Sequence, residues 1–555
     1  MTARQPSDVA WGAFSDDAPW VLPDASPKWR VGGDELRDEV RRSVPELTKP
    51  SRIPPGTRVA KVAGRIGIAL APWVLRKKAG RFKTPESSRA DISRRLRSAA
   101  EDLGPTYIKL GQIISSGQGL FPEELVRQFK LLRDQVPAEP FKVVRRVVEE
   151  DLGRPLEAVF EWFDRQPLAA ASIAQVHAAR LHTGEGVVVK VQRPSVNTLV
   201  RRDIKAMAWL APFLVGRIPI AALANPPALV ELFAETISEE LDFRLEAANM
   251  LDVARVLADL GQRGYVIPRP HPELVTRRVL VMERLEGFAF DDVEGIRAAG
   301  IDTSAVIRTG MVAFMEGALI HGVFHGDLHG GNLFVMADGR TALLDFGITG
   351  RLDDARRNAF LRMMLGASVN DVKAQMTALR DLGALPADSD LDAVIRDLRL
   401  DQPTVDPTTL TGEELVKEVQ RIVKALLGYG ARLPKELMLY VKNMVFLDGA
   451  IATLAPDLDL LAEIATISLY FAQTHGDRIS AELGVDVRNI EVDLDGVKAS
   501  FGVDASTESL TYRELQARRE IINKRMREHA PASGRRIGRR RRRDDNGLAD
   551  VGRNG

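Results

Sequence analysis

Residues 324–335 read FHGDLHGGNLFV, and residues 343–350 read LLDFGITG. Four residues separate Asp327 from Asn332, and Asp345 lies thirteen positions beyond Asn332. Phosphoryl transfer requires oxygen ligands that hold Mg²⁺ against the phosphates, and a carboxylate near the attacking hydroxyl or water. An Asp-x4-Asn loop followed by Asp-Phe-Gly provides these groups, so the stretch indicates a site for phosphoryl transfer.

A hairpin is predicted between the two motifs. Residues 333–336 and 341–344 are apolar runs of strand type, and residues 337–340 form a turn that contains Asp and Gly. The hairpin would bring Asn332 and Asp345 to the same end, where they can share a metal ion. The alternative is two unrelated loops with common Asp and Gly residues. The fixed order, the hairpin and the apolar flanks all argue against it.

A cation for the phosphates is expected upstream of this loop. Lys190 lies in the apolar run VVVKV, at the end of a predicted hairpin. A lysine on a strand is usually solvated at an edge, but burial in this run would require an acidic partner. Asp242 and Glu246 share one helical face, whereas Glu240 would lie about 200° round from Asp242 on a regular helix. We predict Glu246 as the partner of Lys190; a solvated acidic helix is the alternative.

The segment before the first hairpin is rich in alanine. Residues 167–177 read PLAAASIAQVH. In isolation this run favours a helix start, but its place before a hairpin and Lys190 favours a loop over the phosphates. Alanine lacks the tolerance of glycine for positive φ, so this loop should be stiffer than a glycine-rich one.

Four segments together resemble the UbiB family of atypical protein-kinase-like proteins, also called AarF-domain kinases. They are GPTYIKLGQIIS at 104–115, AAASIAQVH at 169–177, ELDFRLEAAN at 240–249, and the HGDLHGGN and DFG pair. The resemblance covers about residues 88 to 475. Each segment alone is a weak signal, but their order and spacing are specific.

The resemblance implies an α+β fold with two protein-kinase-like lobes. The N-lobe would hold a small antiparallel sheet and the C-lobe would be helical, with a helical extension before them. In this family a KxGQ segment, here Lys109 to Gln112, lies over the active site, with Lys109 near Glu240 and Asp242. Such a lid disfavours phosphorylation of proteins and suits ATP hydrolysis or a small substrate.

The resemblance also assigns roles to individual residues. Those expected to take part in catalysis are Asp327, Lys190, Glu246, Lys109 and Gln112. Those expected to bind ATP are Ala169, Ala170, Ala171, Ser172, Lys190, Met282, Glu283, Asn332 and Asp345. Asn332 and Asp345 would hold Mg²⁺, and Lys190 and Glu246 would form an ion pair.

Composition excludes several other classes of protein. The chain has 555 residues, 45% of them hydrophobic, with 77 Lys and Arg against 76 Asp and Glu. It has no Cys, so disulfides, thiolate zinc sites and Cys nucleophiles are excluded. The body is mildly acidic and only the end is basic, which does not fit a nucleic-acid-binding face. The N-terminus shows no signal peptide, and no run of 18 apolar residues is present.

The expected domain order follows from these patterns. It is an extended or disordered segment (1–55), a helical extension with the KxGQ lid (56–150), the N-lobe (151–285), the C-lobe (286–480), a C-terminal helical region (481–530) and a disordered arginine-rich tail (531–555). Residues 66–82, apolar and then basic, favour either a helix on a membrane surface or one packed on the domain. The tail favours contact with anionic lipid or a solubilising role.

The sequence therefore predicts an Mg²⁺-dependent, ATP-binding atypical kinase or ATPase. The family resemblance implies a role in isoprenoid quinone or lipid metabolism, with a lipid or quinone-pathway ligand and quinone-biosynthesis enzymes as partners. Two alternatives are a small-molecule phosphotransferase of the aminoglycoside or choline kinase type and a catalytically silent nucleotide-binding scaffold. We expect a cytoplasmic protein, or one attached peripherally to the inner face of the membrane.

Overall fold

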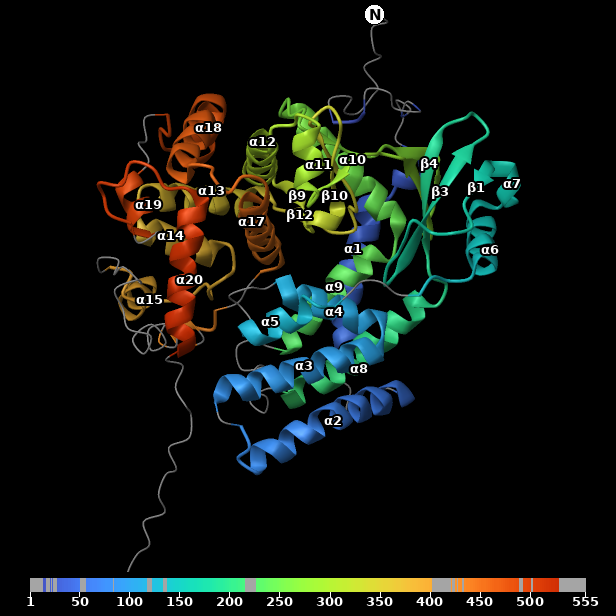
Figure 1. Ribbon diagram of the computed structural model, residues 1–555, viewed down its shortest axis with the longest axis horizontal. Helices are drawn as coiled ribbons and strands as arrows, with labels where there is room; N and C mark the ends of the chain where they lie inside the picture. Colours follow the sequence, from blue (N-terminus) through green and yellow to red (C-terminus); the bar gives the residue numbers. More distant parts are fainter. Residues whose placement is uncertain are drawn as a thin grey trace, which may run out of the picture.

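The computed structural model describes most of the chain. The described residues are 13–15, 20, 22, 27–49, 56–82, 84–116, 122–132, 137–214, 226–401, 421, 425–426, 428–431, 434–488, 493–500 and 503–528. Figure 1 shows strands β1, β3 and β4 at one side, the C-terminal helices at the other, and α2, α3 and α8 below them. The predicted arginine-rich tail, 531–555, lies outside the described residues.

The N-lobe is built on an antiparallel sheet. Its strands are β1 (Phe160–Phe163), β2 (Ala169–Ala170), β3 (Ala174–Leu181), β4 (Gly186–Gln192), β6 (Pro270–Val275) and β7 (Val279–Glu283), in the order β1-β3-β4-β7-β6 with β2 paired to β3. Val187, Val189 and Val191 of β4 pack on one face, with α6 (Phe141–Leu152). Because side chains alternate along a strand, Lys190 points to the opposite face. That face is covered by α10 (Phe243–Asp259).

The C-lobe is mainly helical, with short strands next to the site. Its helices are α11 (Val293–Ala298), α12 (Thr303–Glu316), the π-helical η3 (Gly317–His321), the 3-10 turn η4 (Gly330–Asn332), α13 (Asp354–Ser368), α14 (Val372–Asp381), α15 (Leu391–Leu398), α17 (Lys435–Leu454) and α18 (Leu460–Leu483), followed by α19 (Leu494–Ser500) and α20 (Tyr512–Glu528). A four-stranded sheet has the order β5 (Tyr265–Val266), β11 (Thr341–Leu343), β10 (Leu333–Val335), β8 (Phe288–Ala289). Strand β12 (Thr349–Arg351) pairs with β9 (Val323–His325). The two-lobed, kinase-like α+β fold is the predicted one.

The N-terminal extension is more ordered than the sequence indicates. Its described elements are η1 (Lys28–Arg30), α1 (Gly33–Thr48), α2 (Thr57–Lys78), α3 (Pro85–Leu103), α4 (Pro105–Ser116), α5 (Glu123–Phe129) and α7 (Leu156–Val159), with α8 (Val196–Leu214) packed beside α2. Residues 1–55 were expected to be extended or disordered, but α1 is a 16-residue helix within them. It buries Val44 and Leu47 and packs on α8, α9 (Pro226–Glu240) and α10, so tertiary contacts stabilise a weak local pattern.

Two helical segments are apolar enough to cross a membrane by length and composition. They are Thr303–His321, which is 56% buried, and Lys435–Leu454, which is 50% buried, over the windows tested within the described residues. Both belong to the C-lobe, and core helices of many proteins pass the same test. The sequence analysis found neither segment, because polar residues interrupt their apolar runs.

Candidate active site

Lys190 lies at the centre of a charged cluster between the lobes. Its Nζ is 2.7 Å from Glu246 Oε1 on α10 and 3.2 Å from Asp345 Oδ1. The residue is only 8% exposed. Burial alone would lower the pKa of Lys190, but Asp345 and Glu246 raise it above its usual value, so the ammonium stays charged. Lys190, Glu246 and Asp345 are therefore in contact, as the motifs predict.

A break in the acidic helix allows two of its carboxylates to reach the site. On one regular helix, Glu240 would lie about 200° round from Asp242 and Glu246, so these carboxylates could not all face the cleft. Instead α9 ends at Glu240 and α10 begins at Phe243. Asp242 is the extended N-cap residue of α10, and its side chain accepts a hydrogen bond from Arg244 N at 3.1 Å. The helix is therefore not regular between Glu240 and Asp242, and the angle expected for a regular helix does not apply there.

Glu240 contacts the KxGQ segment. Lys109 Nζ on α4 lies 3.0 Å from Glu240 Oε2, while Asp242 pairs with Arg244 at 2.6 Å. Burial raises the pKa of Glu240 to about 7, against the opposing effect of Lys109, and the nearby charge of Asp345 raises it further. Gln112 lies three positions after Lys109 on α4, and so near the same helical face. An ion pair thus joins the KxGQ segment to the end of α9.

The Asp327 loop is braced by hydrogen bonds to the DFG segment. His325 Nδ1 accepts from Asp327 N at 3.1 Å, which leaves Nε2 protonated to donate to Asp345 O at 2.8 Å. Burial lowers the pKa of His325, which favours this neutral form. Asn332 Nδ2 donates to Asp327 O at 3.0 Å. The loop and the DFG segment therefore hold each other in place.

Asp345 presents a carboxylate to the cleft. Its φ is +57°, a left-handed conformation that Asp tolerates better than most residues, and Gly347 N donates to Oδ1 at 3.2 Å. Burial would raise the pKa of Asp345, but Lys190 and Lys109 lower it to about 2. The side chain is 48% exposed, so the ionised carboxylate is accessible.

Asn332 and Asp345 lie at the same end of the β10–β11 hairpin. Leu333 pairs with Leu343, and Leu344 N donates to Asn332 O at 2.9 Å. Two oxygen donors fit Mg²⁺, which usually takes one or two protein ligands together with phosphate and water oxygens. Over the described ranges, no group of three or more His, Cys, Asp or Glu side chains could hold a metal ion alone.

The alanine-rich segment forms a tight turn, not a helix start. Ala169 and Ala170 pair with Val176 and Gln175 of β3, and Ala171 N donates to Ala174 O at 2.8 Å.

Arg193, just after β4, fastens this turn. Its Nε donates to Ala171 O at 3.0 Å, and its backbone N donates to Ile173 O at 2.9 Å. Ser172, within the turn, is buried. These contacts fit the expected stiffness of the loop.

Met282 and Glu283 lie at the end of β7, opposite Val188 and Val187 of β4. The Glu283 carboxylate accepts hydrogen bonds from Ser15 Oγ and from Arg269 N, the latter at 3.1 Å. Burial raises the pKa of Glu283. Its side chain therefore joins Ser15 of the N-terminal segment to the backbone of Arg269. The nucleotide-binding role that the resemblance assigns to Met282 and Glu283 stays a prediction.

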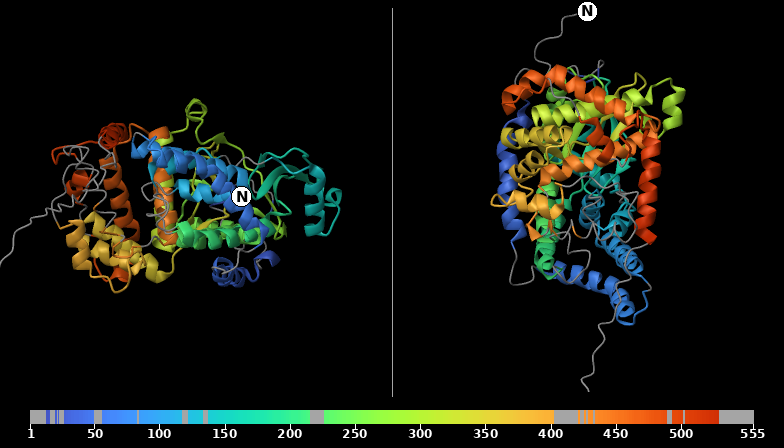
Figure 2. Two further views of the ribbon diagram at one scale, coloured as in Figure 1. Left: turned by 90° about the horizontal axis from the view of Figure 1, so that it is seen from below. Right: turned by 90° about the vertical axis from the view of Figure 1, so that its left-hand side faces the viewer.

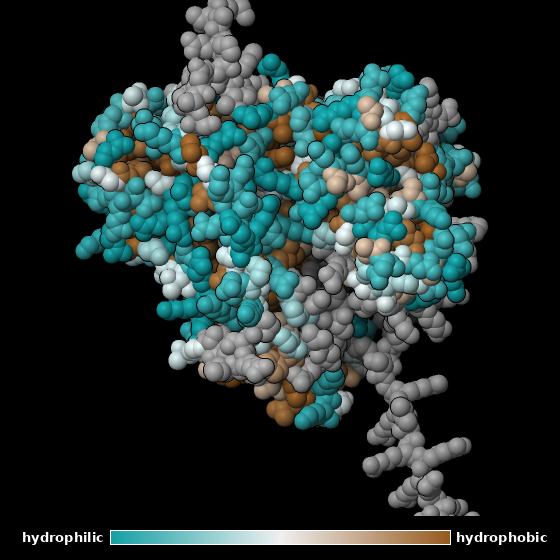
Figure 3. All heavy atoms as spheres, turned by 180° about the vertical axis from the view of Figure 1, so that it is seen from behind, coloured by the Kyte–Doolittle hydropathy of each residue, from teal (hydrophilic) through white to brown (hydrophobic). Residues whose placement is uncertain are grey.

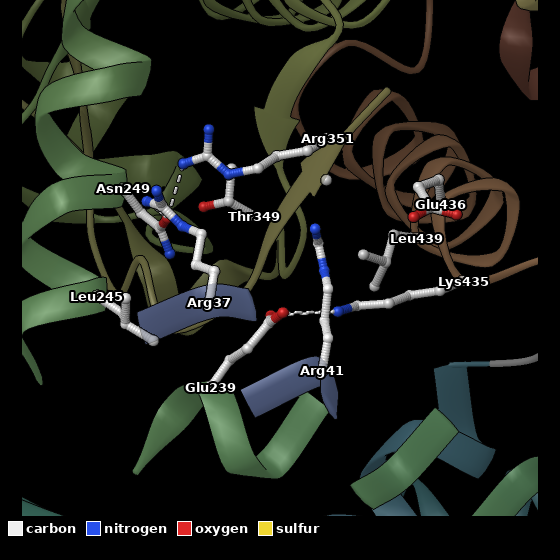
Figure 4. A pocket seen from close by; sticks show the side chains of 11 residues that line it. Arg37, Arg41, Glu239, Leu245, Asn249, Thr349, Arg351, Lys435, Glu436 and Leu439 are labelled. Carbon is white, nitrogen blue, oxygen red and sulfur yellow. Dashed lines mark hydrogen bonds and ion pairs between the residues drawn. The ribbon is translucent and has the colours of Figure 1, made fainter. Parts of the chain in front are cut away.

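A second polar cluster, of Arg37, Asn249 and Arg351 (Figure 4), contacts the DFG segment through Asn249. Asn249 Nδ2 donates to Phe346 O at 2.9 Å. Asn249 Oδ1 accepts from Arg37 on α1 at 3.1 Å and from Arg351 on β12 at 2.9 Å. The sequence analysis missed this connection, because Arg37 falls in a segment without strong periodicity.

Two residues of α17 that the sequence analysis missed contact the Asp327 loop. Lys442 Nζ contacts Asp327 Oδ1. Asn443 Oδ1 accepts from Leu328 N at 3.1 Å, and its Nδ2 donates to His325 O. No local motif marks them, since they lie in an apolar helix more than 100 residues beyond the loop.

The two lobes, the Lys190–Glu246 contact and the Asp327, Asn332 and Asp345 loops define a protein-kinase-like protein. Comparison with known proteins agrees: residues 131–379 match the ABC1 atypical kinase-like domain. The chain belongs to this family, which includes proteins named UbiB and AarF-domain kinases.

Three relatives illustrate the similarity. An uncharacterized protein of Mycobacterium tuberculosis, Rv0647c, is 34% identical over 82% of this chain and 91% of its own length. An uncharacterized aarF domain-containing protein kinase of Arabidopsis thaliana is 33% identical over 66% of this chain and 73% of its own. A probable protein kinase UbiB of Marinobacter nauticus is 31% identical over 71% of each chain.

Proposed function

We propose that this protein is an Mg²⁺-dependent, ATP-binding atypical kinase or ATPase of the UbiB type. The contact of Lys190 with both Glu246 and Asp345, beside Asn332, carries the proposal. A charged lysine held between two carboxylates is ready to bind phosphate oxygens when one carboxylate turns to a metal ion. Mg²⁺, when bound, would neutralise charge on the phosphates.

Each residue of the cleft has its own role in this proposal. Lys190 offers its charge to the phosphates, and Glu246 keeps the lysine in position. Asp345 and Asn332 are the oxygen donors for the metal ion. Asp327 is placed to orient the attacking hydroxyl or water and accept its proton. Electrostatic stabilisation by such fixed charges usually provides the largest part of catalysis.

The lid favours water or a small molecule as the acceptor. Lys109 contacts Glu240 at 3.0 Å, at the edge of the charged cluster. A peptide substrate would have to displace this contact between α4 and α9. Aminoglycoside and choline kinases have no such extension, so the lid also separates this proposal from the phosphotransferase alternative.

The test is nucleotide binding and hydrolysis by the full chain. Asp345→Asn should abolish the Mg²⁺-dependent part of ATP affinity, measured by calorimetry with Mg²⁺ and with EDTA. Asp338→Asn is the matched control, since Asp338 lies in the turn at the other end of the same hairpin, paired with Arg340. Unchanged MgATP affinity in Asp345→Asn would remove Asp345 from the metal site. Tight binding without turnover would favour a scaffold.

We further propose that the protein works at an anionic membrane surface, in lipid or isoprenoid quinone metabolism. Helix α2 supports this: it has no acidic residue, exposes Ile68 and Leu75 at 68% each, and ends in Arg76, Lys77 and Lys78. Figures 1 and 2 show α2 at one end of the molecule, and Figure 3 shows hydrophobic and hydrophilic atoms side by side at that end. An apolar stripe with adjoining basic residues fits an interfacial helix.

Vesicle binding tests the membrane proposal separately from ATP chemistry. Wild type should sediment with anionic vesicles and not with neutral ones, and Ile68→Ser/Leu75→Ser should weaken this at least about tenfold. Leu469→Ser is the control, because Leu469 is 58% exposed on α18. Equal binding by both variants would exclude α2 as the membrane contact.

A further inference from the structure

Lys442 is a cation that reaches the Asp327 loop from a distant part of the chain. The loop itself, residues 325–332, contains no Lys or Arg. The side chains of Lys442 and Asp327 are each 17% exposed, and Nζ contacts Oδ1. The loop has two histidines: His325 is buried, whereas His329 is exposed and its Nδ1 accepts from Gly331 N at 3.1 Å. Helix α17 therefore provides a charge beside Asp327 that the loop lacks.

Asn443 fixes α17 against the loop. It is fully buried, donates to His325 O, and accepts from Leu328 N at 3.1 Å. These two hydrogen bonds lie on either side of Asp327 in the sequence. The backbone of α17 is thus held in register with the loop, and the position of Lys442 relative to Asp327 is determined by the fold.

The surroundings of Asp327 explain why a cation is needed there. Asp345 and Glu240 lie close enough to influence the charge of the cluster, and each would repel the Asp327 carboxylate. Lys190 and Lys109 are paired with these carboxylates. Lys442, Lys109 and His329 all oppose the repulsion at Asp327. Lys442 has the largest effect of the three, and its Nζ contacts Oδ1 directly.

We propose that Lys442 is a positioning residue for phosphoryl transfer. It holds Oδ1 of Asp327, so that Oδ2 is left for the attacking hydroxyl or water. In the step, the nucleophile oxygen bonds to the terminal phosphorus as the bond to the bridging oxygen breaks. ADP leaves with that electron pair, and the proton of the nucleophile passes to Asp327. This inference rests on the proposed function and extends it to a helix outside both kinase motifs.

Steady-state hydrolysis of MgATP by the full chain tests the role. Lys442→Met should lower kcat about 10- to 100-fold, as for a misplaced catalytic group, while KM for MgATP changes less than about threefold. Lys442→Arg should recover most of kcat, because it keeps a charge in the same place. Lys435→Met is the matched control: Lys435 is also buried on α17, paired with Glu235 and Glu239, but off the loop. It should lower stability and leave kcat near that of wild type.

Two kinetic results would overturn the inference. One is a kcat for Lys442→Met equal to that for Lys435→Met. The other is a rise in KM alone, which would assign Lys442 to nucleotide binding.

A double-mutant cycle separates this inference from the proposed function. Urea unfolding of wild type, Lys442→Met, Asp327→Asn and the double variant measures the coupling between the two side chains without any turnover. If wild type hydrolyses MgATP no faster than Asp327→Asn, the proposed function fails, while a non-zero coupling still supports the pair. If the coupling is zero, the Lys442 inference fails whatever the turnover.

Discussion

Glu240 is a buried carboxylate that lies between a lysine and other carboxylates. Lys109 contacts it. Burial is the main reason that the pKa of Glu240 is raised to about 7, and the charges of Asp345 and Asp327 raise it as well. Near neutral pH this group therefore changes charge. The pKa of Glu240 is about 7 in the folded protein and about 4.5 in the unfolded chain. Its protonated form therefore stabilises the folded protein fully below about pH 4.5, and this contribution to the free energy of unfolding is lost as pH rises through about 7.

Glu240→Gln should remove this pH dependence. The gain in Tm of the variant over wild type, measured in Mg²⁺-free protein, should be larger at pH 8 than at pH 5, since glutamine stays neutral. Glu231→Gln, exposed on the same helix, is the control and should show no such difference. An equal gain for Glu240→Gln at both pH values would contradict the raised pKa.

Variants of the Lys190–Glu246 pair distinguish an effect on stability from an effect on catalysis. Breaking a buried pair costs about 3–5 kcal/mol, whereas replacing both partners by apolar residues is often neutral. Lys190→Met should therefore lower both the free energy of unfolding and turnover. Lys190→Met/Glu246→Met should recover stability in urea but not ATP hydrolysis. Recovery of hydrolysis in the double variant would show that the charge of Lys190 is not required.

At the scale of elements, the alanine-rich turn is held by contacts from two neighbouring strands. β2 pairs with β3, and Arg193 binds the turn from the end of β4. Its backbone has little freedom to follow a bound nucleotide. The helix break at Asp242 also determines the geometry of the site. Because of it, Glu240 at the end of α9 and Glu246 on α10 both face the same cleft.

Ala170→Gly should loosen the turn. Glycine costs about 0.5–1 kcal/mol relative to alanine in ordered backbone and opens conformations with positive φ. The variant should change the ratio of ATP to ADP affinity, measured by calorimetry on wild type and variant in parallel. Identical ATP and ADP affinities in the two proteins would count against a role of turn stiffness in nucleotide choice.

At the scale of the whole molecule, α1 is connected to the active site through α10. Asp252 binds Arg30 at 2.7 Å and Arg351 at 2.6 Å, and Asn249 connects Arg37 to the carbonyl of Phe346. Helix α1 therefore supports the DFG segment through Asn249 of α10.

Arg37→Ala should lower ATP turnover although Arg37 does not reach the cleft. Coupling of this kind usually amounts to about 0.5–2 kcal/mol, or roughly 2- to 30-fold in rate. Arg41→Ala, one turn further along α1 with a side chain 52% exposed, is the control. Equal turnover of the two variants would show that α1 does not influence the DFG segment.

The parts of the site that follow from sequence are those encoded locally. Asp327 and Asn332 directly precede the β10–β11 hairpin and Asp345 directly follows it, and the strand pattern around Lys190 reveals its hairpin as well. The break at Asp242 escaped prediction because an apolar helical pattern continues through it. Lys442 escaped because its helix is far along the chain, and only tertiary packing brings it to Asp327.

The position of Lys442 also affects how this protein can be divided or recombined. The stretch that defines the family ends at residue 379, and it begins at residue 131. A fragment cut at those limits would keep Lys190, Glu246, Asp327, Asn332 and Asp345. It would lose Arg37, Lys109 and Lys442, three cations that make their contacts from outside the matched stretch. The matched stretch is therefore smaller than the unit that forms the cleft, and chimeras between relatives should exchange α1, α4 and α17 together with it.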